Sequence, residues 1–207
     1  MRNSQRIKWG TVRSAVLIFN NGGIMDMKKA VVFLADGMEE CEGLITVDIL
    51  RRSGMEVTMA SIMGRRSITS SRNIVILADA LAEEIDYQEV DLIVLPGGRI
   101  GTENLMADEL VRRKCLEFAG ERRLAAICAA PSILADLGLL EGRKATCHPD
   151  FEGKTRGAKL TGNSVTVDGN ITTGQGLGAT FAFALSLVTD LVGKEAADRI
   201  AASICLK

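Results

Sequence analysis

The sequence of 207 residues is poor in the residues that build metal sites and disulfide frameworks. Its one histidine, His148, directly follows Cys147, and its five cysteines contain no C-x-x-C pair. Adjacent ligands do not have chelating spacing, so no zinc or other metal is expected. An odd number of cysteines without paired spacing argues against a disulfide framework and favours a reducing compartment. A cytoplasmic location is therefore expected.

A long apolar run and a surplus of charge of one sign are also missing. No segment approaches the ~20 apolar residues that cross a bilayer, so the sequence does not predict a membrane protein. The 25 basic and 26 acidic residues give a formal net charge of -1. This balance provides no general attraction to nucleic-acid phosphates or anionic lipids, and neither kind of partner is expected.

Nucleotide-binding fingerprints are missing as well, although the chain has 21 glycines. The stretch from Gly174 to Gly178 lacks the G-x-G-x-x-G spacing. The P-loop pattern fails because His148 stands at its first glycine position before Gly153-Lys-Thr155. No cofactor of any kind is expected.

The first 27 residues differ from the rest of the chain. Their basic residues are accompanied by no acid before Asp26, which weakly matches a transit peptide, and their apolar part is too short for a secretory signal. We favour a start codon assigned too early, because a glycine pair that a ribosome-binding sequence could encode stands shortly before Met25 and Met27. Residues 1–27 are predicted to be a poorly ordered extension or a mis-assigned start, and residues 28–207 a single domain.

Beyond this segment, strand patterns alternate with helical patterns. The continuous apolar runs at 30–35 and 91–95 are typical of strands buried on both faces, and the helical stretch 39–52 directs Leu44 and Val47 toward the core. The alternation predicts an α/β sandwich with a largely parallel sheet. The other predicted strands lie at 56–61, in the run that ends at Cys128, and at 144–147. A hairpin-like or edge segment is predicted at 67–77, and strand residues around a turn at 164–173. Helices are predicted at 108–119, at 181–191 with Phe181, Leu185, Val188 and Leu191 at helical spacing, and from 194.

One segment is the strongest candidate for chemistry, Leu124-Ala-Ala-Ile-Cys-Ala-Ala-Pro131. Its apolar run stops at Cys128, and a stretch of small residues compatible with a helix begins immediately. This pattern predicts a strand-to-helix elbow that projects the cysteine above the sheet, where the first N–H groups of the helix favour a thiolate. The alternative is a buried, unreactive thiol, which is common for free cysteine. The segment alone supports both interpretations equally.

Other reactive residues fall where predicted strands end, the edge at which α/β sheets bind ligands. Glu42 either complements the dipole of its own helix or faces the thiol as a protonated acid that shuttles a proton. His148 is either a satisfied structural group or a proton relay to Cys128. Gly98 and Ala129 could donate N–H groups to an oxyanion, although Gly98 is equally consistent with an ordinary glycine turn.

An ordered set of short motifs runs through residues 28–207. The set consists of Gly37-Met-Glu-Glu-Cys-Glu42, Ser71-Arg72, Leu95-Pro-Gly-Gly98, Ala125-Ala-Ile-Cys-Ala-Ala-Pro131, His148-Pro149 and Gly176-Leu-Gly-Ala-Thr180. It resembles the ThiJ/PfpI family, and within it the branch of parkinsonism-associated deglycases often called DJ-one. The resemblance implies a flavodoxin-like, three-layer α/β sandwich and a homodimer.

The resemblance also implies a role for each site residue. Cys128 would be an oxidation-prone nucleophile, Glu42 its protonated hydrogen-bond partner and proton shuttle, and His148 an assisting group. Gly98 and Ala129 would supply the N–H groups that bind the oxyanion.

The resemblance also implies a role for Arg72, and the sequence departs from the family pattern at Gln175 and Ala129. Arg72 would help to form an anion site near the cysteine, but Gln175 stands where some members carry arginine, which makes that site less basic. Ala129 stands where peptidase-like members carry histidine directly after the nucleophile. A cysteine peptidase or amidase is therefore only the third candidate function.

Two function classes rank above it. In the first, the protein is a cysteine-dependent, glutathione-independent glyoxalase or deglycase that converts methylglyoxal, glyoxal or early glycation adducts through a Cys128 hemithioacetal, with Glu42 as proton shuttle. In the second, it is a non-enzymatic sensor of oxidative stress or a redox chaperone, in which peroxide oxidises Cys128 to a sulfinate. The first is favoured.

Overall fold

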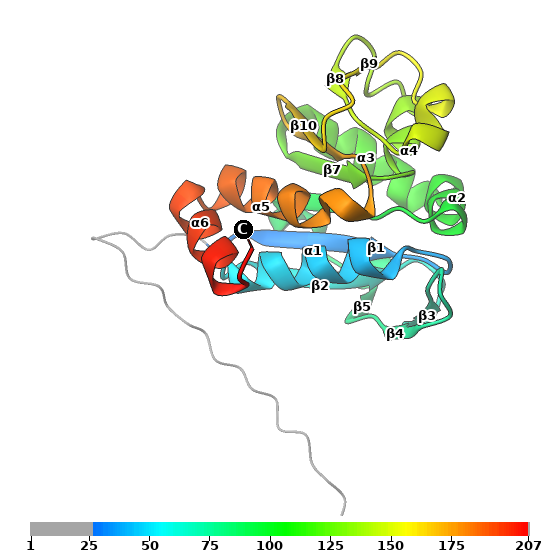
Figure 1. Ribbon diagram of the computed structural model, residues 1–207. Coiled ribbons are helices and arrows are strands. Elements are labelled where there is room, and N and C mark those ends of the chain that lie inside the picture. Colours follow the sequence, from blue (N-terminus) through cyan, green and yellow to red (C-terminus); the bar gives the residue numbers. More distant parts are fainter. Residues whose placement is uncertain (1–26, 207) are drawn as a thin grey trace, which may run out of the picture.

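The structure, a computed structural model, describes residues 27–206 (Figure 1). Within these residues the chain forms a seven-stranded sheet with the strand order β10-β11-β7-β6-β1-β2-β5. Its strands are β1 (Lys29–Leu34), β2 (Glu56–Ser61), β5 (Ala80–Leu81), β6 (Leu92–Leu95), β7 (Arg123–Ile127), β10 (Val165–Asp168) and β11 (Ile171–Gly174). All neighbours are parallel except the edge pair β10 and β11. The predicted α/β fold with a largely parallel sheet is confirmed.

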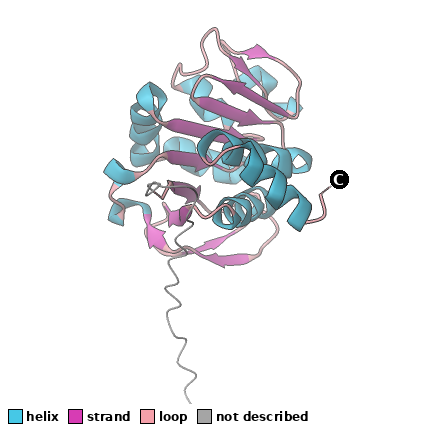
Figure 2. Cartoon of the chain, turned by 90° about the vertical axis from the view of Figure 1, so that its left-hand side faces the viewer, coloured by secondary structure: helices cyan, strands magenta, loops and turns pink. Residues whose placement is uncertain are grey.

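Helices cover both faces of this sheet, which gives the molecule three layers (Figure 1, Figure 2). The helices are α1 (Glu40–Arg52), α2 (Arg99–Ala107), α3 (Glu109–Glu121), α4 (Pro131–Asp136), α5 (Thr180–Leu191) and α6 (Lys194–Ser203). Helices α1, α5 and α6 share one hydrophobic core with the sheet, to which Val47, Phe183 and Ile200 contribute. Helices α2, α3 and α4 share the core on the other face, which includes Leu105 and Phe118.

The sequence of β1 shows why both cores form. Ala30, Val32 and Leu34 enter one core, and Val31 and Phe33 enter the other, because successive side chains of a strand point to opposite faces. All residues of β6 are likewise buried. A continuous apolar run is therefore the pattern of a strand that lies in the centre of this sheet.

Short elements complete the framework. The hairpin predicted within 67–77 is present as an antiparallel pair of strands, and a second pair of short strands lies near the carboxyl edge. These elements are β3 (Ser67–Thr69), β4 (Val75–Leu77), β8 (Lys144–Ala145), β9 (Lys159–Leu160), and the 3-10 helices η1 (Ala82–Glu84), η2 (Tyr87–Glu89), η3 (Pro149–Lys154) and η4 (Leu177–Ala179).

The sequence does not predict α2. Its first residue follows Gly98, and Gly101 lies within its first turn, so the segment has the composition of a loop. Both glycines have a packing role instead, since a Cβ at Gly98 would lie 2.4 Å from the Gly37 carbonyl oxygen and one at Gly101 would lie 2.7 Å from Met38. The close approach of α2 to the amino end of α1 requires glycine at these positions.

The predicted inner faces of two helices are partly wrong. Leu44 is 37% exposed, because α1 buries the face that carries Val47 and Leu50. In α5, Phe181 is exposed whereas Phe183 is fully buried. Both helices carry apolar residues on more than one face, so the packing of α1 against α5 decides which face is buried.

The prediction for the first 27 residues lies, apart from Met27, outside the described residues. Among residues 27–206, no helix combines the length and the apolar character needed to span a membrane.

Candidate active site

Cys128 lies at a sharp turn directly after β7. Its φ is +66°, in the left-handed region that costs a non-glycine residue about 1–2 kcal/mol. Two backbone hydrogen bonds hold this conformation. The Cys128 N–H donates to the Gly174 carbonyl (2.9 Å), and the Cys128 carbonyl accepts from the His148 N–H (2.9 Å). With Pro131 as the first residue of α4, the chain forms the predicted strand-to-helix elbow.

Two backbone N–H groups lie within hydrogen-bonding reach of the Cys128 sulfur. They belong to Gly98 and Ala129, and both favour the thiolate. Gly98 follows β6 and Ala129 follows β7, and these two strands are neighbours in the sheet. The parallel arrangement thus brings the two predicted oxyanion donors to the same place.

Glu42 lies in the first turn of α1 and is 1% exposed. Its Oε2 accepts a hydrogen bond from the Gly97 N–H (2.9 Å). Within residues 27–206, its Oε1 is buried without a hydrogen-bond partner. Burial raises the pKa of this carboxyl to about 7, and the charge of Glu39 adds to the rise, while the Cys128 thiol and the Gly97 N–H oppose it. A buried acid that stays partly protonated near neutral pH is suited to donate and accept protons.

Gly97 is the spacer between this acid and the nucleophile. A Cβ at Gly97 would lie 2.5 Å from Glu42 Oε2 and 2.6 Å from Cys128 Cβ. Both distances are far below van der Waals contact, so no side chain fits between the two groups. The motif that contains Gly97 is visible in the sequence, but this spacing role requires the structure.

The thiol does not have a lowered pKa while Glu42 is ionised. Burial raises the pKa of Cys128 to about 12, and the negative charge of Glu42 adds to the rise. This corrects the expectation from the elbow pattern alone. When Glu42 is protonated, its charge no longer opposes the thiolate and the Gly98 and Ala129 N–H groups remain. Protonation of Glu42 thus removes one cause of the raised pKa of Cys128, whereas the larger cause, burial, remains.

His148 flanks the site from a second segment. Its Nδ1 accepts a hydrogen bond from the Asp150 N–H (3.2 Å) and caps η3, which leaves Nε2 to carry the proton of the neutral ring. A Cβ at Gly176 would lie 3.6 Å from His148 Cδ2 and 3.9 Å from Cys128 Sγ. The imidazole and the thiol thus border the same glycine, and the side chain of His148 is 43% exposed.

Arg72 is not joined to this group by any hydrogen bond or ion pair of the described residues. It is exposed in the turn between β3 and β4, where its guanidinium donates to the Ser71 carbonyl (3.3 Å). That turn packs on the start of α1, since the Ser71 hydroxyl donates to Glu40 Oε2 (3.1 Å). The role of Arg72 in an anion site stays a prediction.

The other four cysteines divide into two kinds. Cys115 and Cys147 are buried, and Cys41 and Cys205 are exposed. Burial raises the pKa of Cys115 to about 12 and also raises the pKa of Cys147. These surroundings agree with packing rather than with catalysis.

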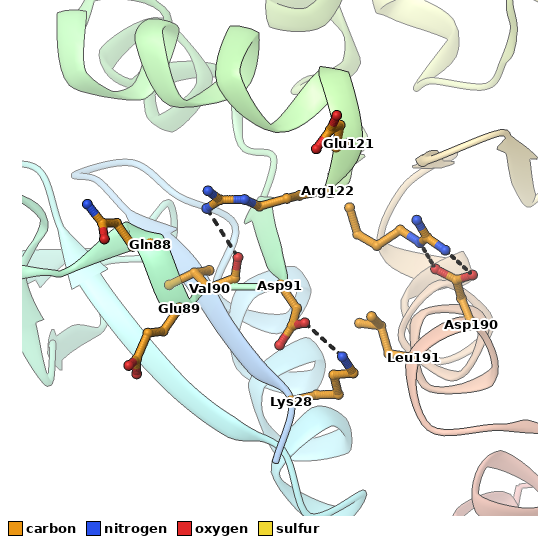
Figure 3. Close-up of a pocket in the computed structure, with 10 residues that line it drawn as sticks. Lys28, Gln88, Glu89, Val90, Asp91, Glu121, Arg122, Asp190 and Leu191 are labelled. Atoms are coloured by element: carbon orange, nitrogen blue, oxygen red, sulfur yellow. Dashed lines mark hydrogen bonds and ion pairs between the residues drawn. The ribbon is translucent and has the colours of Figure 1, made fainter. Parts of the chain in front are cut away.

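A cavity of about 360 Å³ lies at the opposite, amino end of the strands (Figure 3). Lys28 Nζ and Asp91 Oδ1 form an ion pair there (2.9 Å), and Arg123 pairs with Asp190. Among the described residues, no cysteine, serine or histidine lines this cavity. Across residues 27–206, no cluster of three or more histidine, cysteine or acidic side chains could hold a metal ion. The elbow at Cys128 is therefore the candidate active site.

Comparisons with known proteins identify the family of this chain. Residues 28–190 match the DJ-1/PfpI family. The chain is 37% identical over 185 residues to the Parkinson disease protein 7 homolog of Danio rerio. This alignment covers 87% of this chain and 98% of that protein. It is 33% identical over 144 residues to Deglycase TK1284 of Thermococcus kodakarensis. This second alignment covers 69% of this chain and 86% of that protein.

A solved structure is also similar to this chain. The crystal structure of Drosophila melanogaster DJ-1beta matches with a TM-score of 0.85 at 34% sequence identity. The match covers 88% of this chain and 100% of the other.

Proposed function

The chain belongs to the DJ-1/PfpI family, and from this membership and the geometry at Cys128 we propose that it is a cysteine-dependent, glutathione-independent glyoxalase or deglycase. Its substrates are methylglyoxal, glyoxal or early glycation adducts. The observation that carries the proposal is the buried Glu42 carboxyl, held one glycine away from the nucleophile with its pKa raised to about 7. The family includes a protein named as a deglycase.

In the first step, the Cys128 sulfur attacks the aldehyde carbon of the dicarbonyl. As the C–S bond forms, the thiol proton passes to the ionised Glu42 carboxylate and the Gly98 and Ala129 N–H groups stabilise the negative charge that develops on the carbonyl oxygen. Glu42 then returns the proton to that oxygen, which completes the hemithioacetal. The now ionised Glu42 is close enough to accept the next proton, because Gly97 keeps the two groups adjacent.

In the second step, Glu42 removes the proton from the hemithioacetal carbon and gives an enediol-like intermediate. Return of that proton to the neighbouring carbon produces a 2-hydroxyacyl thioester on Cys128. Water then hydrolyses the thioester, which releases a 2-hydroxy acid and the free thiol. His148, next to the sulfur and half-exposed, assists this exchange with water.

One observation also favours the second candidate function, a sensor of oxidation. The unpartnered Oε1 of Glu42 can hydrogen-bond to a sulfinate on Cys128 when the carboxyl is protonated. Such a bond would stabilise the oxidised form. Both functions use the same pair of residues.

The deciding experiment is glutathione-free conversion of methylglyoxal to lactate by the wild type and by Cys128→Ala. We expect complete loss of turnover in the variant, because the proposed hemithioacetal forms on Cys128. Cys205→Ser, which changes an exposed cysteine, is the matched control and should keep full activity. Retained turnover in Cys128→Ala contradicts the nucleophile, and no turnover in the wild type favours the sensor.

We also propose that two copies associate into a homodimer in the cytoplasm. Apolar side chains on β4 and α1 face solvent in the single chain, with Val75 71%, Leu77 70% and Leu44 37% exposed. Burial of such side chains against a second copy would remove them from water. Light scattering should give the mass of two chains for the wild type, and Leu77→Lys should shift it toward that of one.

A further inference from the structure

Two cationic side chains stand over the same aromatic ring beside the elbow. Arg99 is the first residue of α2, directly after the oxyanion donor Gly98, and Lys154 is the last residue of η3. The Arg99 guanidinium carbon lies 5.3 Å from the centre of the Phe151 ring, and Lys154 Nζ lies 5.2 Å from it. The two charges are therefore within about 10.5 Å of each other.

Phe151 links these cations to the nucleophile. Its side chain is 6% exposed and packs with Ala129 and Cys147, and Cys128 packs against the same cluster. The ring thus holds Arg99 and Lys154 next to the elbow from two different segments, α2 and η3. Neither segment is adjacent to the other in sequence, so the arrangement is a product of the fold.

Neither cation is neutralised by a carboxylate. Among residues 27–206, no acidic oxygen lies within 4.0 Å of Arg99 or Lys154, whereas Lys28 and Arg123 at the amino end of the strands are both ion-paired. The nearest acidic residues in sequence are Glu103, four residues after Arg99 on α2, and Asp150 and Glu152 on η3; all three are exposed and weaken the local positive potential without pairing to either cation. Each cation contacts the ring on one side only, so N–H groups on its other side can donate hydrogen bonds to an anion.

We propose that Arg99 and Lys154 form an anion subsite at the mouth of the active site, so that the enzyme prefers 2-oxoaldehydes that carry a carboxylate a few bonds from the aldehyde. This inference rests on the proposed glyoxalase function. The subsite binds the charged end of the substrate while Cys128 attacks the other end. Since the carboxylate takes no part in the chemistry, the preference lies in KM rather than in kcat.

A matched pair of substrates tests the preference. 4,5-Dioxopentanoate and 2-oxopentanal have the same five-carbon chain and differ in the terminal carboxylate. We expect kcat/KM to be about tenfold higher for the anionic substrate at low ionic strength, and added sodium chloride to reduce this ratio. Arg99→Gln and Lys154→Gln should each lower the ratio about threefold, and the double variant should abolish it with unchanged kcat/KM for 2-oxopentanal.

A second readout needs no turnover. Iodoacetate and iodoacetamide both alkylate Cys128 and differ in charge, so the ratio of their rates reports the local potential at the sulfur. The double variant should lower the iodoacetate-to-iodoacetamide ratio about tenfold. Arg199→Gln, the same change on α6 at the far side of the sheet, should leave it unaltered.

The outcomes separate this inference from the proposed function. Equal kcat/KM for the two substrates in the wild type, or an alkylation ratio that the double variant does not change, overturns the subsite while leaving methylglyoxal turnover intact. If no dicarbonyl is turned over but the alkylation ratio falls as expected, the anion subsite stands and the proposed reaction does not.

Discussion

The two ends of the parallel sheet differ in how completely their polar groups are satisfied. At the amino end, Lys28 and Arg123 are ion-paired around the cavity of Figure 3. At the carboxyl end, Cys128 has a positive φ, and Glu42 keeps one buried oxygen that has no partner within the described part of the chain. Unsatisfied or strained groups destabilise a fold and persist where they serve a function. The size of a cavity is therefore a poorer guide to the candidate active site than the state of its polar groups.

The largest expected effect is on proton transfer at the carboxyl end. Glu42→Gln should keep the fold but lower methylglyoxal turnover about 10²–10⁴-fold, because the amide cannot exchange a proton with the substrate. Steady-state kinetics with circular dichroism of the same samples measures both properties. Glu121→Gln, which lines the cavity at the amino end, is the control and should be fully active. An equal loss of turnover in both variants would contradict the assignment of proton transfer to the carboxyl end of the sheet.

Glu42 should also make stability depend on pH. Its folded-state pKa of about 7 lies above the ordinary 4.5, so its stabilising contribution is complete below about pH 4.5 and is lost as the pH rises through 7. The loss is about 3 kcal/mol. Urea unfolding at pH 5 and pH 8 measures it, and Glu42→Gln should remove most of the difference. A wild type equally stable at both pH values would contradict the raised pKa.

Separating the acid from the nucleophile should have a somewhat smaller effect. Gly97→Ala places a Cβ between Glu42 and Cys128, which should lower turnover about 100-fold and destabilise the fold by about 1–3 kcal/mol. Gly178→Ala is the matched control, since a Cβ there meets no atom within 4 Å. Kinetics and thermal unfolding of both variants test the difference. Comparable activity in both would show that the spacing at Gly97 is not required.

The smallest effect is expected at the amino end. Arg123→Gln removes the ion pair with Asp190, whose two side chains are 37% and 34% exposed. Solvent weakens such a pair, so the free energy of unfolding should fall by less than about 1 kcal/mol, and turnover should not change. Chemical denaturation and methylglyoxal kinetics check both statements. A clear drop in turnover would show that the two ends of the sheet are coupled.

The sequence predicts those features that depend on local pattern. A buried strand in this sheet has few polar positions, so the runs at β1, β6 and β7 are recognisable, and the stop at Cys128 identifies the elbow. The ends of parallel strands meet at one edge, which is why Glu42, Gly98 and His148 could be grouped without coordinates. These predictions need only the periodicity of side chains and the direction of strands.

Features that depend on packing could not be predicted in this way. The glycines that let α2 approach α1 look like loop residues, and the buried face of α5 is chosen by its neighbour. The raised pKa of Cys128 follows from burial and from the charge on Glu42, neither of which is visible in the elbow sequence. The pairing of Arg99 and Lys154 over Phe151 joins two distant segments, and no local signal identifies it.

The two backbone hydrogen bonds of Cys128 have a consequence for the reaction cycle. Its N–H is held by a strand of the sheet and its carbonyl by the segment that carries His148. In the proposed reaction, the sulfur would pass through thiol, hemithioacetal and thioester states without a change in these two hydrogen bonds. The strained backbone at Cys128 is thereby fixed by the fold rather than by a bound substrate.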